Sequence, residues 1–378
     1  MTKKANRGSS VVMLLVLLLA LGGSVHADGP ITVASGFNGP QGVLVTPDNG
    51  IWVIDANAVT RVAGDGSKTV MASLPTTASP EGGEVVGGSR LVLFNATMFA
   101  TNGQWDINAN RQGDPPAGVA TVLKIENGGW TALADLWAFE KANNPDGKQL
   151  DSYPYGLTAG SDGMLYVTDE RANALLKVNP GNGQTSWVAT LPGVSNNSGL
   201  GPPVSEPVPT AVVRDSDGSF YVSYLPGFPF TPGASRVVKI APDGDISDYA
   251  TGLTSTSDLR RGPDGNLYGV QFAIYSQQGP APNSGALVRI RPGTGSQVVI
   301  SGLNYPTSVD FNADGDAFLT VGGPAPSGAV VKYTKIATPA PPPPAEVPEP
   351  ATIILLGTGM MGLLGYARTR RQRPTTAG

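Results

Sequence analysis

Two acidic residues, Glu81 and Asp258, occupy related positions in a phrase that recurs along the chain, and they are the first candidates for chemistry. Two carboxylates near a common axis could hold a divalent cation such as Ca²⁺, or act as a general acid and a general base. The same positions also suit solvated polar side chains with no catalytic role. The sequence therefore leaves catalysis and metal binding open at these two residues, and favours a protein that is not an enzyme.

Most other catalytic chemistry is excluded by composition. The chain has no Cys and a single His, His26, which falls in a segment that we expect to be removed from the mature protein. Ser-His-Asp and Cys-His catalysis therefore lack their base, and a zinc site lacks its usual ligands. The segment beginning at Asp310 starts like an EF-hand calcium loop. However, Val321 stands where that loop needs a bidentate Glu, so we interpret the segment as a hairpin turn.

The recurring phrase reads Pro-x-Gly, a short apolar run, an Asp-Gly turn and a second apolar strand. Repeats of about 50 residues made of short strands indicate a β-propeller, in which the start of each inner strand lies at the rim of the central channel. The middle residue of each opening is therefore a candidate channel-rim residue. These residues are Gln41, Glu81, Tyr155, Thr210, Asp258 and Thr307.

Six blades account for the spacing of the turns. Successive Asp-Gly turns lie 47 to 55 residues apart from Asp162 onward, whereas 114 residues separate Asp48 from Asp162, which leaves room for two blades. We expect the missing blade to be a degenerate copy that opens at residues 80–82 and has its second strand at residues 91–94. The fold class is thus an all-β, six-bladed propeller, which we place at residues 28–336.

The two ends of this region suggest how the ring closes. The last blade lacks an outer strand, and residues 31–37 are expected to form a strand that precedes the first inner strand and belongs to none of the other blades. We predict that this N-terminal strand completes the last blade and covers an edge that would otherwise invite aggregation. Two further segments depart from the repeat: we expect a short helix at 132–143, and a long polar insertion at 95–118 on a face where binding sites are often found.

Targeting signals are expected at both ends of the chain. Residues 1–27 combine a basic start, a short apolar run and small residues, so we expect a secretory signal peptide cut after Ala27. A Pro-rich linker at 337–350 precedes an apolar segment at 351–367, expected to form a transmembrane helix, and a basic tail at 368–378. Positive charge after the span keeps the tail cytoplasmic, so the propeller faces the other side of the membrane.

The C-terminal signal resembles a known sorting device. Pro348-Glu349-Pro350, the apolar span and the Arg cluster follow the order of the PEP-CTERM signal that exosortases process in Gram-negative bacteria producing extracellular polysaccharide. The resemblance implies an exosortase-type protease as partner and an anchor in the inner membrane until processing. It implies a location in the periplasm or cell envelope, with release to the extracellular matrix as a further outcome. A permanent single-span anchor is the alternative.

Charge argues against one class of partner. Seven of the 25 basic residues lie in the two targeting ends, which leaves 18 against all 29 acidic residues and a net charge of about −11 for residues 28–350. A body this acidic repels phosphate backbones, so we do not expect it to bind nucleic acid.

Two resemblances bear on function. The carboxylates at the channel rim resemble the arrangement in six-bladed gluconolactonase-like (NHL/SMP-30-like) propellers, which implies calcium, although Tyr155 and Thr210 stand where further amide or acid ligands are wanted. The phrases at 138–147 and 225–234, with the segment from Tyr249, look like the ScyD/ScyE-like propeller family encoded beside scytonemin biosynthesis genes. That resemblance implies an exported propeller of undefined activity and supplies no catalytic residues.

The segment 225–234 also offers two aromatic side chains, Phe228 and Phe230, on a Pro-containing turn. These rings could stack on sugars or on small aromatic ligands, or they could plug the channel mouth as core residues. The first hypothesis is therefore a binding or assembly module for extracellular matrix components such as polysaccharide. The alternatives are a calcium-dependent hydrolase or lactonase that uses Glu81 and Asp258, and an accessory protein of aromatic pigment biosynthesis.

Overall fold

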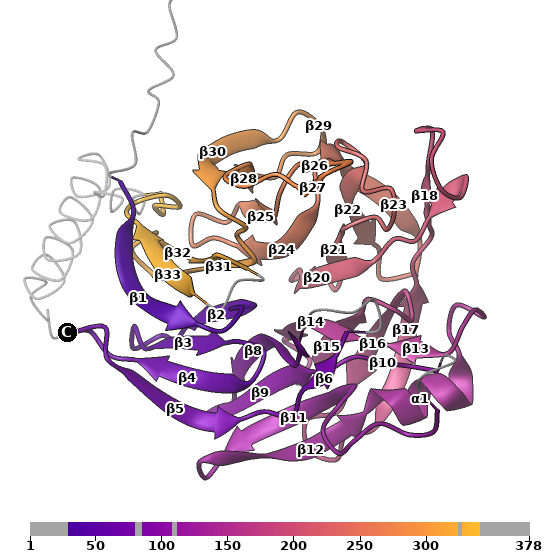
Figure 1. Cartoon of the computed structure of the whole chain (residues 1–378), viewed down its shortest axis with the longest axis horizontal. Helices are drawn as coiled ribbons and strands as arrows, with labels where there is room; N and C mark the ends of the chain where they lie inside the picture. The colour runs from indigo at the N-terminus through magenta and orange to yellow at the C-terminus, as the bar shows by residue number, and fades with distance from the viewer. Residues whose placement is uncertain (1–28, 80–84, 108–111, 324–326, 341–378) are drawn as a thin grey trace, which may run out of the picture. The chain divides into compact units, whose positions relative to one another are not determined.

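The computed structural model describes residues 29–79, 85–107, 112–323 and 327–340. Within these residues the strands form six blades arranged as a ring (Figure 1): five four-stranded sheets and one sheet of five strands. The prediction of an all-β, six-bladed propeller is confirmed. The propeller unit extends to Pro339, and the linker, apolar segment and basic tail that we predicted beyond it lie almost wholly outside the described residues. Among the described residues, no helix has the length and apolar character needed to cross a membrane.

The strands of each blade are given from the centre outward. The first three blades consist of β2 (Gly42–Val45), β3 (Ile51–Ile54), β4 (Ala58–Val62) and β5 (Lys68–Ser73); β8 (Gly88–Phe94), β9 (Thr97–Asn102), β11 (Thr121–Glu126) and β12 (Gly129–Asp135); and β14 (Pro154–Ala159), β15 (Leu165–Asp169), β16 (Ala174–Val178) and β17 (Thr185–Thr190). The last three consist of β20 (Pro209–Arg214), β21 (Phe220–Tyr224), β22 (Ser235–Ile240) and β23 (Ile246–Leu253), with β29 (Gly293–Thr294) at its edge; β24 (Thr256–Arg261), β25 (Leu267–Gln271), β28 (Gly285–Arg289) and β30 (Gln297–Leu303); and β31 (Ser308–Phe311), β32 (Ala317–Val321), β33 (Gly328–Tyr333) and β1 (Ile31–Phe37).

The ring closes as predicted, through the N-terminal strand. β1 pairs antiparallel with β33, in a register that places Ile31 opposite Lys332 and Phe37 opposite Gly328. At the centre each inner strand contacts the two beside it, in the order β2, β8, β14, β20, β24, β31 and back to β2. The first and last parts of the propeller are therefore held together both at the outer edge and at the axis.

The Asp-Gly turns join the inner strand of a blade to its second strand. Gly163 has φ 82° and Gly265 has φ 82°, a conformation that a side chain disfavours. Each turn is fastened by a tyrosine on the strand that follows: the Tyr166 hydroxyl donates to Asp162 Oδ2 at 2.6 Å. The same contact recurs in the fifth blade, from Tyr268 to Asp264, at 2.8 Å. The third and fifth blades therefore share this fastening of the turn.

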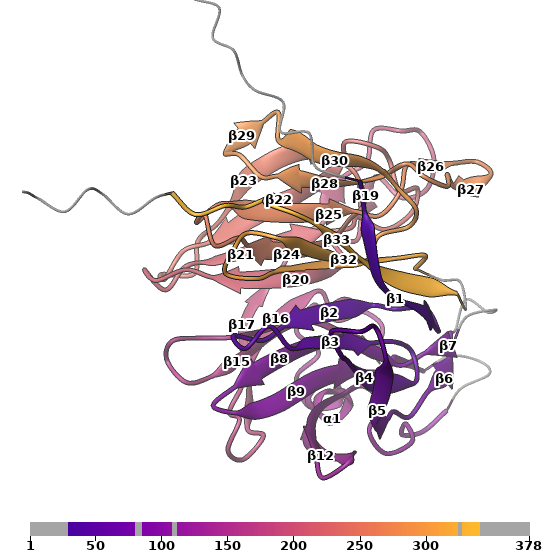
Figure 2. The same cartoon turned by 90° about the vertical axis from the view of Figure 1, so that its left-hand side faces the viewer.

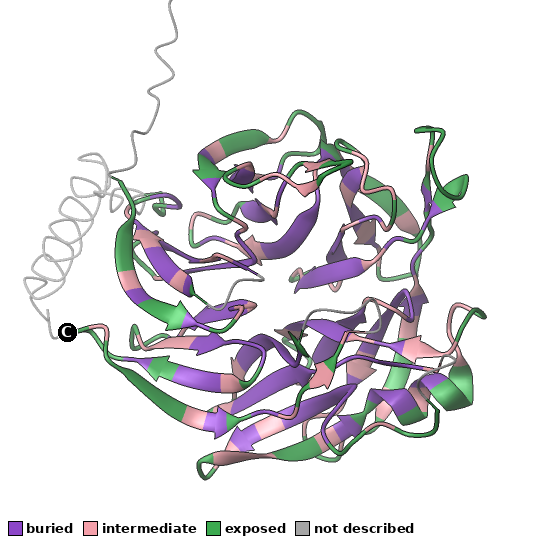
Figure 3. Cartoon of the chain, in the orientation of Figure 1, coloured by how far each residue is buried: buried purple, intermediate pink, exposed green. Residues whose placement is uncertain are grey.

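Apolar residues fill the space between neighbouring blades. Six clusters of buried side chains lie one between each adjacent pair of sheets, and the cluster at the closure joins Phe37 of β1 to Val43 and Val53 of the first blade. The inner strands are largely buried, while the outer strands β5 and β1 show exposed residues along their length (Figure 3). Each fully buried Val, Leu or Phe stabilises the fold by about 1.5–3 kcal/mol relative to exposure, so the blades hold one another in place.

The structure corrects our interpretation of the second blade. Residues 91–94, expected as its second strand, belong to the inner strand β8, which begins at Gly88. The tight turn that follows is Asn95-Ala96, with φ 48° and 60°, and it lacks the Asp-Gly signature that marks the other blades. Residues 80–82, expected to open the blade, lie outside the described residues. The expected insertion at 95–118 is also shorter, because 97–102 is strand β9.

The predicted helix is confirmed in part. α1 spans Leu136–Asn143, and the Asp135 carboxylate caps it by accepting a hydrogen bond from Ala138 N at 2.8 Å. The residues from 132 to 135, expected within the helix, belong to the outer strand β12 instead. Asp135 is both the last residue of β12 and the N-cap of α1, so the strand leads directly into the helix.

Additional hairpins gather on one face of the ring. Strand direction alternates within a blade, so the connection from second to third strand and the connection to the next blade emerge on the same face. Four small two-stranded pairs lie in such connections: β6–β7 (Thr77–Ala78, Val85–Val86), β10–β13 (Trp105–Asp106, Asp151–Ser152), β18–β19 (Val194–Ser195, Val204–Ser205) and β26–β27 (Tyr275–Ser276, Gly279–Pro280). We call this side the insertion face. Figure 2 shows two of these pairs, β6–β7 and β26–β27, projecting on the same side of the ring.

Closure by β1 generates a prediction. A variant that begins at residue 39 lacks β1. It leaves the edge of β33 unpaired and exposes the apolar side chains against which Phe37 packs. With both variants ended at Pro339, we expect this one to be recovered mainly as aggregate, whereas a variant that begins at residue 29 remains soluble. The measurement is the soluble fraction after expression, followed by thermal unfolding. A soluble, cooperatively unfolding protein without β1 would contradict the closure.

Candidate functional site

The centre of the ring is filled by side chains of the inner strands. At the third position of the strand opening, four blades have the small residues Gly42, Gly156, Ala211 and Ser308. The second and fifth blades instead have Arg90 and Asp258 at this position. The strand register shows the equivalence, because the residue after each of them, Leu91 or Leu259, pairs with the second strand of its own blade. A long cation and a carboxylate therefore enter a space that small residues leave free.

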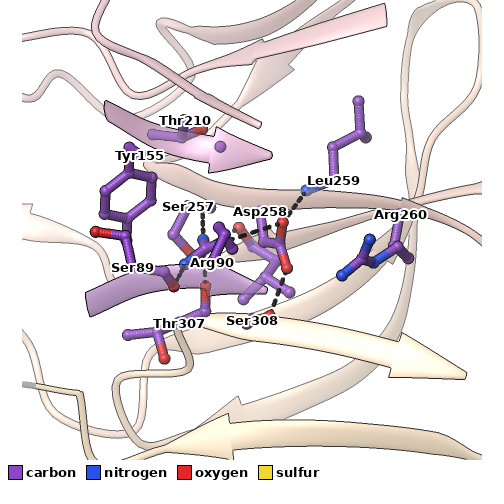
Figure 4. Close-up of polar contacts among 12 residues, drawn as sticks. Ser89, Arg90, Tyr155, Thr210, Ser257, Asp258, Leu259, Arg260, Thr307 and Ser308 are labelled. Carbon is purple, nitrogen blue, oxygen red and sulfur yellow. Dashed lines mark hydrogen bonds and ion pairs between the residues drawn. The ribbon is translucent and has the colours of Figure 1, made fainter. Parts of the chain in front are cut away.

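Arg90 binds the backbone of four inner strands (Figure 4). Its Nη1 donates to the carbonyl oxygens of Gln41 at 2.5 Å and Ser89 at 3.0 Å. Its Nη2 donates to the carbonyl oxygens of Ser257 at 2.6 Å and Thr307 at 3.1 Å. These four acceptors belong to the openings of the first, second, fifth and sixth blades, so one guanidinium fastens two-thirds of the ring.

The charge of Arg90 is balanced by Asp258. Arg90 Nε lies 3.4 Å from Asp258 Oδ1, and both side chains are only 3% exposed. The guanidinium also lies over the ring of Tyr155, 4.4 Å from its centroid, which adds the third blade. Burial by itself lowers the pKa of Arg90, but Asp258 and Tyr155 outweigh burial and the pKa is raised. Arg90 is therefore charged at every physiological pH.

Asp258 has no free carboxylate oxygen. Its Oδ2 accepts hydrogen bonds from the Ser308 hydroxyl at 2.7 Å and from Val309 N at 3.1 Å, and its Oδ1 accepts one from Leu259 N at 2.9 Å. These donors, together with Arg90, satisfy a buried carboxylate well. Asp258 therefore joins the fifth blade to the sixth and to the second.

The other predicted rim residues are also engaged in the ring. Thr210 Oγ1 donates to the Thr256 carbonyl of the next blade at 2.9 Å, and Thr307 Oγ1 donates to the Pro40 carbonyl at 2.6 Å. The Tyr155 hydroxyl donates to Gln41 Oε1 at 3.0 Å across the centre. Asp258, Thr210, Thr307 and Tyr155 are all buried, so a solvated rim is wrong for these four residues.

The register of the fifth blade also differs from our prediction. The middle residue of its opening is Ser257, not Asp258, and the Ser257 hydroxyl donates to the Pro306 carbonyl at 3.4 Å. The sequence could have shown this register, because the middle residue of an opening lies seven residues before the Asp of the turn in the other regular blades. In the fifth blade the residue seven positions before Asp264 is Ser257. Arg90 had no comparable signal, because its blade lacks the Asp-Gly turn.

A divalent cation does not fit the described centre. The space beside Asp258 is taken by the Arg90 guanidinium, and the carboxylate oxygens already accept their hydrogen bonds. No group of three or more His, Cys, Asp or Glu side chains able to hold a metal occurs among the described residues. Glu81, the other proposed carboxylate, lies outside the described residues, so the two-carboxylate site stays a prediction.

A cavity lies on the insertion face, over the second to fourth blades, and we call it the loop cleft. Its volume is about 780 Å³. Its lining residues are Ser79, Val86, Gln104, Asp146, Lys148, Gln149, Asp151, Tyr153, Glu170, Arg171, Asn173, Glu206, Val208, Gly227, Phe228 and Phe230. All of them lie in connections between strands or blades. The cleft can therefore vary in sequence while the ring beneath it stays fixed.

Aromatic rings line one side of the loop cleft. Phe228 is 58% exposed and meets Phe230 edge to face, with centroids 6.5 Å apart. Phe230 in turn stacks on Tyr275, with centroids 4.7 Å apart and planes 26° apart. Phe228 is thus an exposed ring that packs against Phe230. Of the two predicted stacking residues, Phe228 is the one with a face open to a ligand.

Acidic and amide groups also line the cleft. Asn173 Nδ2 donates to Asp146 Oδ2 at 2.8 Å and to Glu206 Oε2 at 2.9 Å, and Lys148 Nζ lies 2.5 Å from the same Glu206 oxygen. Burial, reinforced by the neighbouring carboxylates, raises the pKa of Asp151 to about 7. These residues thus offer hydrogen-bonding groups on fixed supports and an excess of carboxylates.

A buried carboxylate, Glu140 of α1, lies close to these acidic residues. It is 1% exposed, and neither of its oxygens has a hydrogen-bond partner among the described residues. Burial and then repulsion from Asp169, Asp146 and Asp151 raise its pKa to about 8. Sequence analysis placed this residue on a helix but gave no sign that it is buried with other acids.

Comparison with known proteins supports the predicted fold and the predicted export of the chain. Residues 346–371 match the PEP-CTERM protein-sorting motif. The predicted sorting signal is thereby confirmed, and it implies export, anchoring at the C-terminus until processing, and an exosortase as the processing protease. No curated protein matches the chain in sequence.

Solved structures of other proteins are similar in fold. A gluconolactonase from Xanthomonas campestris superposes with a TM-score of 0.53 at 14% identity, over 82% of this chain and 91% of that one. The PQQ-bound aldose sugar dehydrogenase from Streptomyces coelicolor gives 0.51 at 14% identity, over 82% and 97%. At this level of identity the similarity shows the propeller fold and no more. The ScyD/ScyE-like resemblance is not tested by these comparisons and stays a prediction.

The raised pKa of Glu140 predicts a pH dependence of stability. The unfolded carboxyl titrates near 4.5 and the folded one near 8, so the folded state binds the extra proton in between and stability falls as pH rises through this window. Glu140→Gln removes the titration. We compare the free energies of unfolding of Glu140→Gln and of the unmodified chain. We expect the difference between them to shift in favour of the variant by at least about 1 kcal/mol from pH 5 to pH 8.5.

The control for this measurement is Glu126→Gln. The pKa of this exposed carboxyl is lowered by a hydrogen bond from Lys124, so its replacement should give no gain in stability as pH rises. Denaturant unfolding at both pH values checks the prediction. A Glu140→Gln difference that does not change with pH would show that Glu140 has an ordinary pKa.

Proposed function

We propose that this chain is an exported carbohydrate-binding propeller that acts as a binding or assembly module for extracellular matrix components at the cell envelope. The observation that carries the proposal is the loop cleft, a cavity of about 780 Å³ whose lining combines an exposed aromatic ring with carboxylate and amide groups. Aromatic faces pack on the C–H faces of sugar rings, while amides and carboxylates bind hydroxyl groups. The sorting motif supplies the matching address, because it implies export of the propeller.

The centre of the ring supports a binding role rather than catalysis there. Propellers often place reactive groups in the channel, but here Arg90 and Asp258 bond each other and the surrounding backbone. Their oxygen and nitrogen atoms are committed to holding the inner strands. Ligand recognition is therefore assigned to the face of the ring, where Phe228, Asp151 and their neighbours reach the cleft.

The calcium-dependent lactonase alternative draws on the fold of the Xanthomonas campestris gluconolactonase. It still requires Glu81 and Asp258 to share a metal, and the bonded state of Asp258 counts against that arrangement. The accessory role in aromatic pigment biosynthesis rests on the resemblance to the ScyD/ScyE-like family, although Phe228 would suit a flat aromatic ligand as well. A pigment-like ring is therefore a competing ligand for the same cleft.

The proposal is tested by removing one ring from the cleft. Phe228→Ala removes the exposed ring face on which a sugar would stack. Stacking on an aromatic ring contributes on the order of 1 kcal/mol, so we expect binding to weaken at least fivefold. The probe is an array of bacterial oligosaccharides, followed by calorimetry on the best binder. Trp187→Ala is the matched control, because Trp187 is also 58% exposed but lies on the outer strand β17, away from the lining of the cleft.

Binding that is lost in Phe228→Ala and kept in Trp187→Ala supports the loop cleft as the site. Equal losses in both variants, or no binding to any oligosaccharide, would contradict the proposed function. Binding of a flat aromatic dye that oligosaccharides fail to displace would transfer the site to the pigment alternative.

A further inference from the structure

The charge balance of the loop cleft is unusual for a site that binds neutral sugars. Four carboxylates line it, Asp146, Asp151, Glu170 and Glu206, against two cations, Lys148 and Arg171. Lys148 Nζ lies 2.5 Å from Glu206 Oε2 and 4.0 Å from Asp146 Oδ2, so it is already engaged by the acids of the cleft. The lining thus keeps an excess of negative charge after its own ion pairs are counted.

More acids lie beneath the lining. Asp169 is buried and accepts hydrogen bonds from the Ser152 hydroxyl at 2.5 Å and from Tyr153 N at 2.7 Å. Burial, with repulsion from Asp169 and Asp146, is what raises the pKa of Asp151, while Arg171 only partly offsets it. A group that brings positive charge into the cleft relieves this repulsion.

Glu140 adds an independent sign of a missing partner. Glu140 is 1% exposed, its two carboxyl oxygens have no hydrogen-bond partner among the described residues, and Asp169, Asp146 and Asp151 lie near enough to raise its pKa. Buried polar groups in folded proteins are almost always satisfied. In the lining itself, Asn173 Oδ1 is also buried without a hydrogen-bond partner among the described residues. These acceptors indicate that a ligand of the cleft supplies hydrogen-bond donors, as an ammonium group does.

We propose that the loop cleft selects a sugar that has a free, protonated amino group, such as a hexosamine unit of a partly deacetylated polysaccharide. The inference rests on the proposed function and names its ligand class. The pyranose ring stacks on Phe228, hydroxyl groups bind the amide of Gln149, and the ammonium group faces Asp151. Anionic sugars and phosphates are repelled by the same carboxylates and by the acidic body of the chain.

The aromatic side favours a sugar over a lysine-containing peptide as the source of the ammonium group. A peptide would need apolar pockets or an exposed strand edge, whereas the cleft offers one free ring face and hydrogen-bonding groups on connections between strands. The described residues contain no group of carboxylates able to hold a metal ion, which separates an organic cation from a metal here.

The experiment compares two ligands that differ only in charge. Calorimetry at pH 7 and low salt measures the purified chain against a glucosamine tetrasaccharide and against the same tetrasaccharide fully N-acetylated. We expect the glucosamine form to bind at least tenfold more tightly. Asp151→Asn should reduce this preference to less than threefold, and added salt should weaken it, because the contact is electrostatic.

Glu126→Gln is the control, since it removes one exposed carboxylate far from the lining and should leave the preference unchanged. Equal affinity for the two tetrasaccharides, or tighter binding of the acetylated one, would overturn the inference and leave the proposed function standing. Failure of both tetrasaccharides and of every neutral oligosaccharide would contradict the proposed function as well. Tighter binding of tetralysine than of the glucosamine tetrasaccharide would overturn the sugar assignment.

Discussion

A buried ion pair sets the architecture of this propeller. Arg90 and Asp258 are both 3% exposed, and such a pair is stable only when its remaining donors and acceptors are satisfied. Arg90 donates from Nη1 and Nη2 to carbonyl groups of four blades, while its Nε has only the ion-pair contact with Asp258 among the described residues. Asp258 accepts hydrogen bonds from Ser308, Leu259 and Val309. The charges therefore link the inner strands of neighbouring blades at the centre of the ring.

The consequences reach the face of the ring. With the inner strands fixed by the ion pair and by hydroxyl contacts such as those from Thr210 and Thr307, the connections above them can differ freely between blades. The second to fourth blades use this freedom to assemble the loop cleft, whose residues come from segments between Ser79 and Phe230. A rigid centre and a variable face together explain how a repeat of six similar blades obtains one asymmetric binding site.

The sequence showed the repeat because the Asp-Gly turns are fastened locally, as between Asp162 and Tyr166, and closure followed from one unclaimed strand. It misplaced the second blade because Asn95-Ala96 makes the same tight turn without that signature. Arg90 was missed for this reason, and the pairing with Asp258 joins positions far apart in the chain. The loop cleft was missed beyond Phe228 and Phe230, since irregular connections have no period by which to align them.

The central claim is that Arg90 and Asp258 act as one unit, and a double-mutant cycle tests it most directly. Denaturant unfolding would be measured for Arg90→Met, Asp258→Asn, the double variant and the unmodified chain, with Arg90→Lys as a milder change if Arg90→Met fails to fold. Removing one partner leaves the other charge buried and should cost about 3–5 kcal/mol, so we predict that the double variant loses at least about 2 kcal/mol less than the sum of the singles. Strictly additive losses would contradict the account.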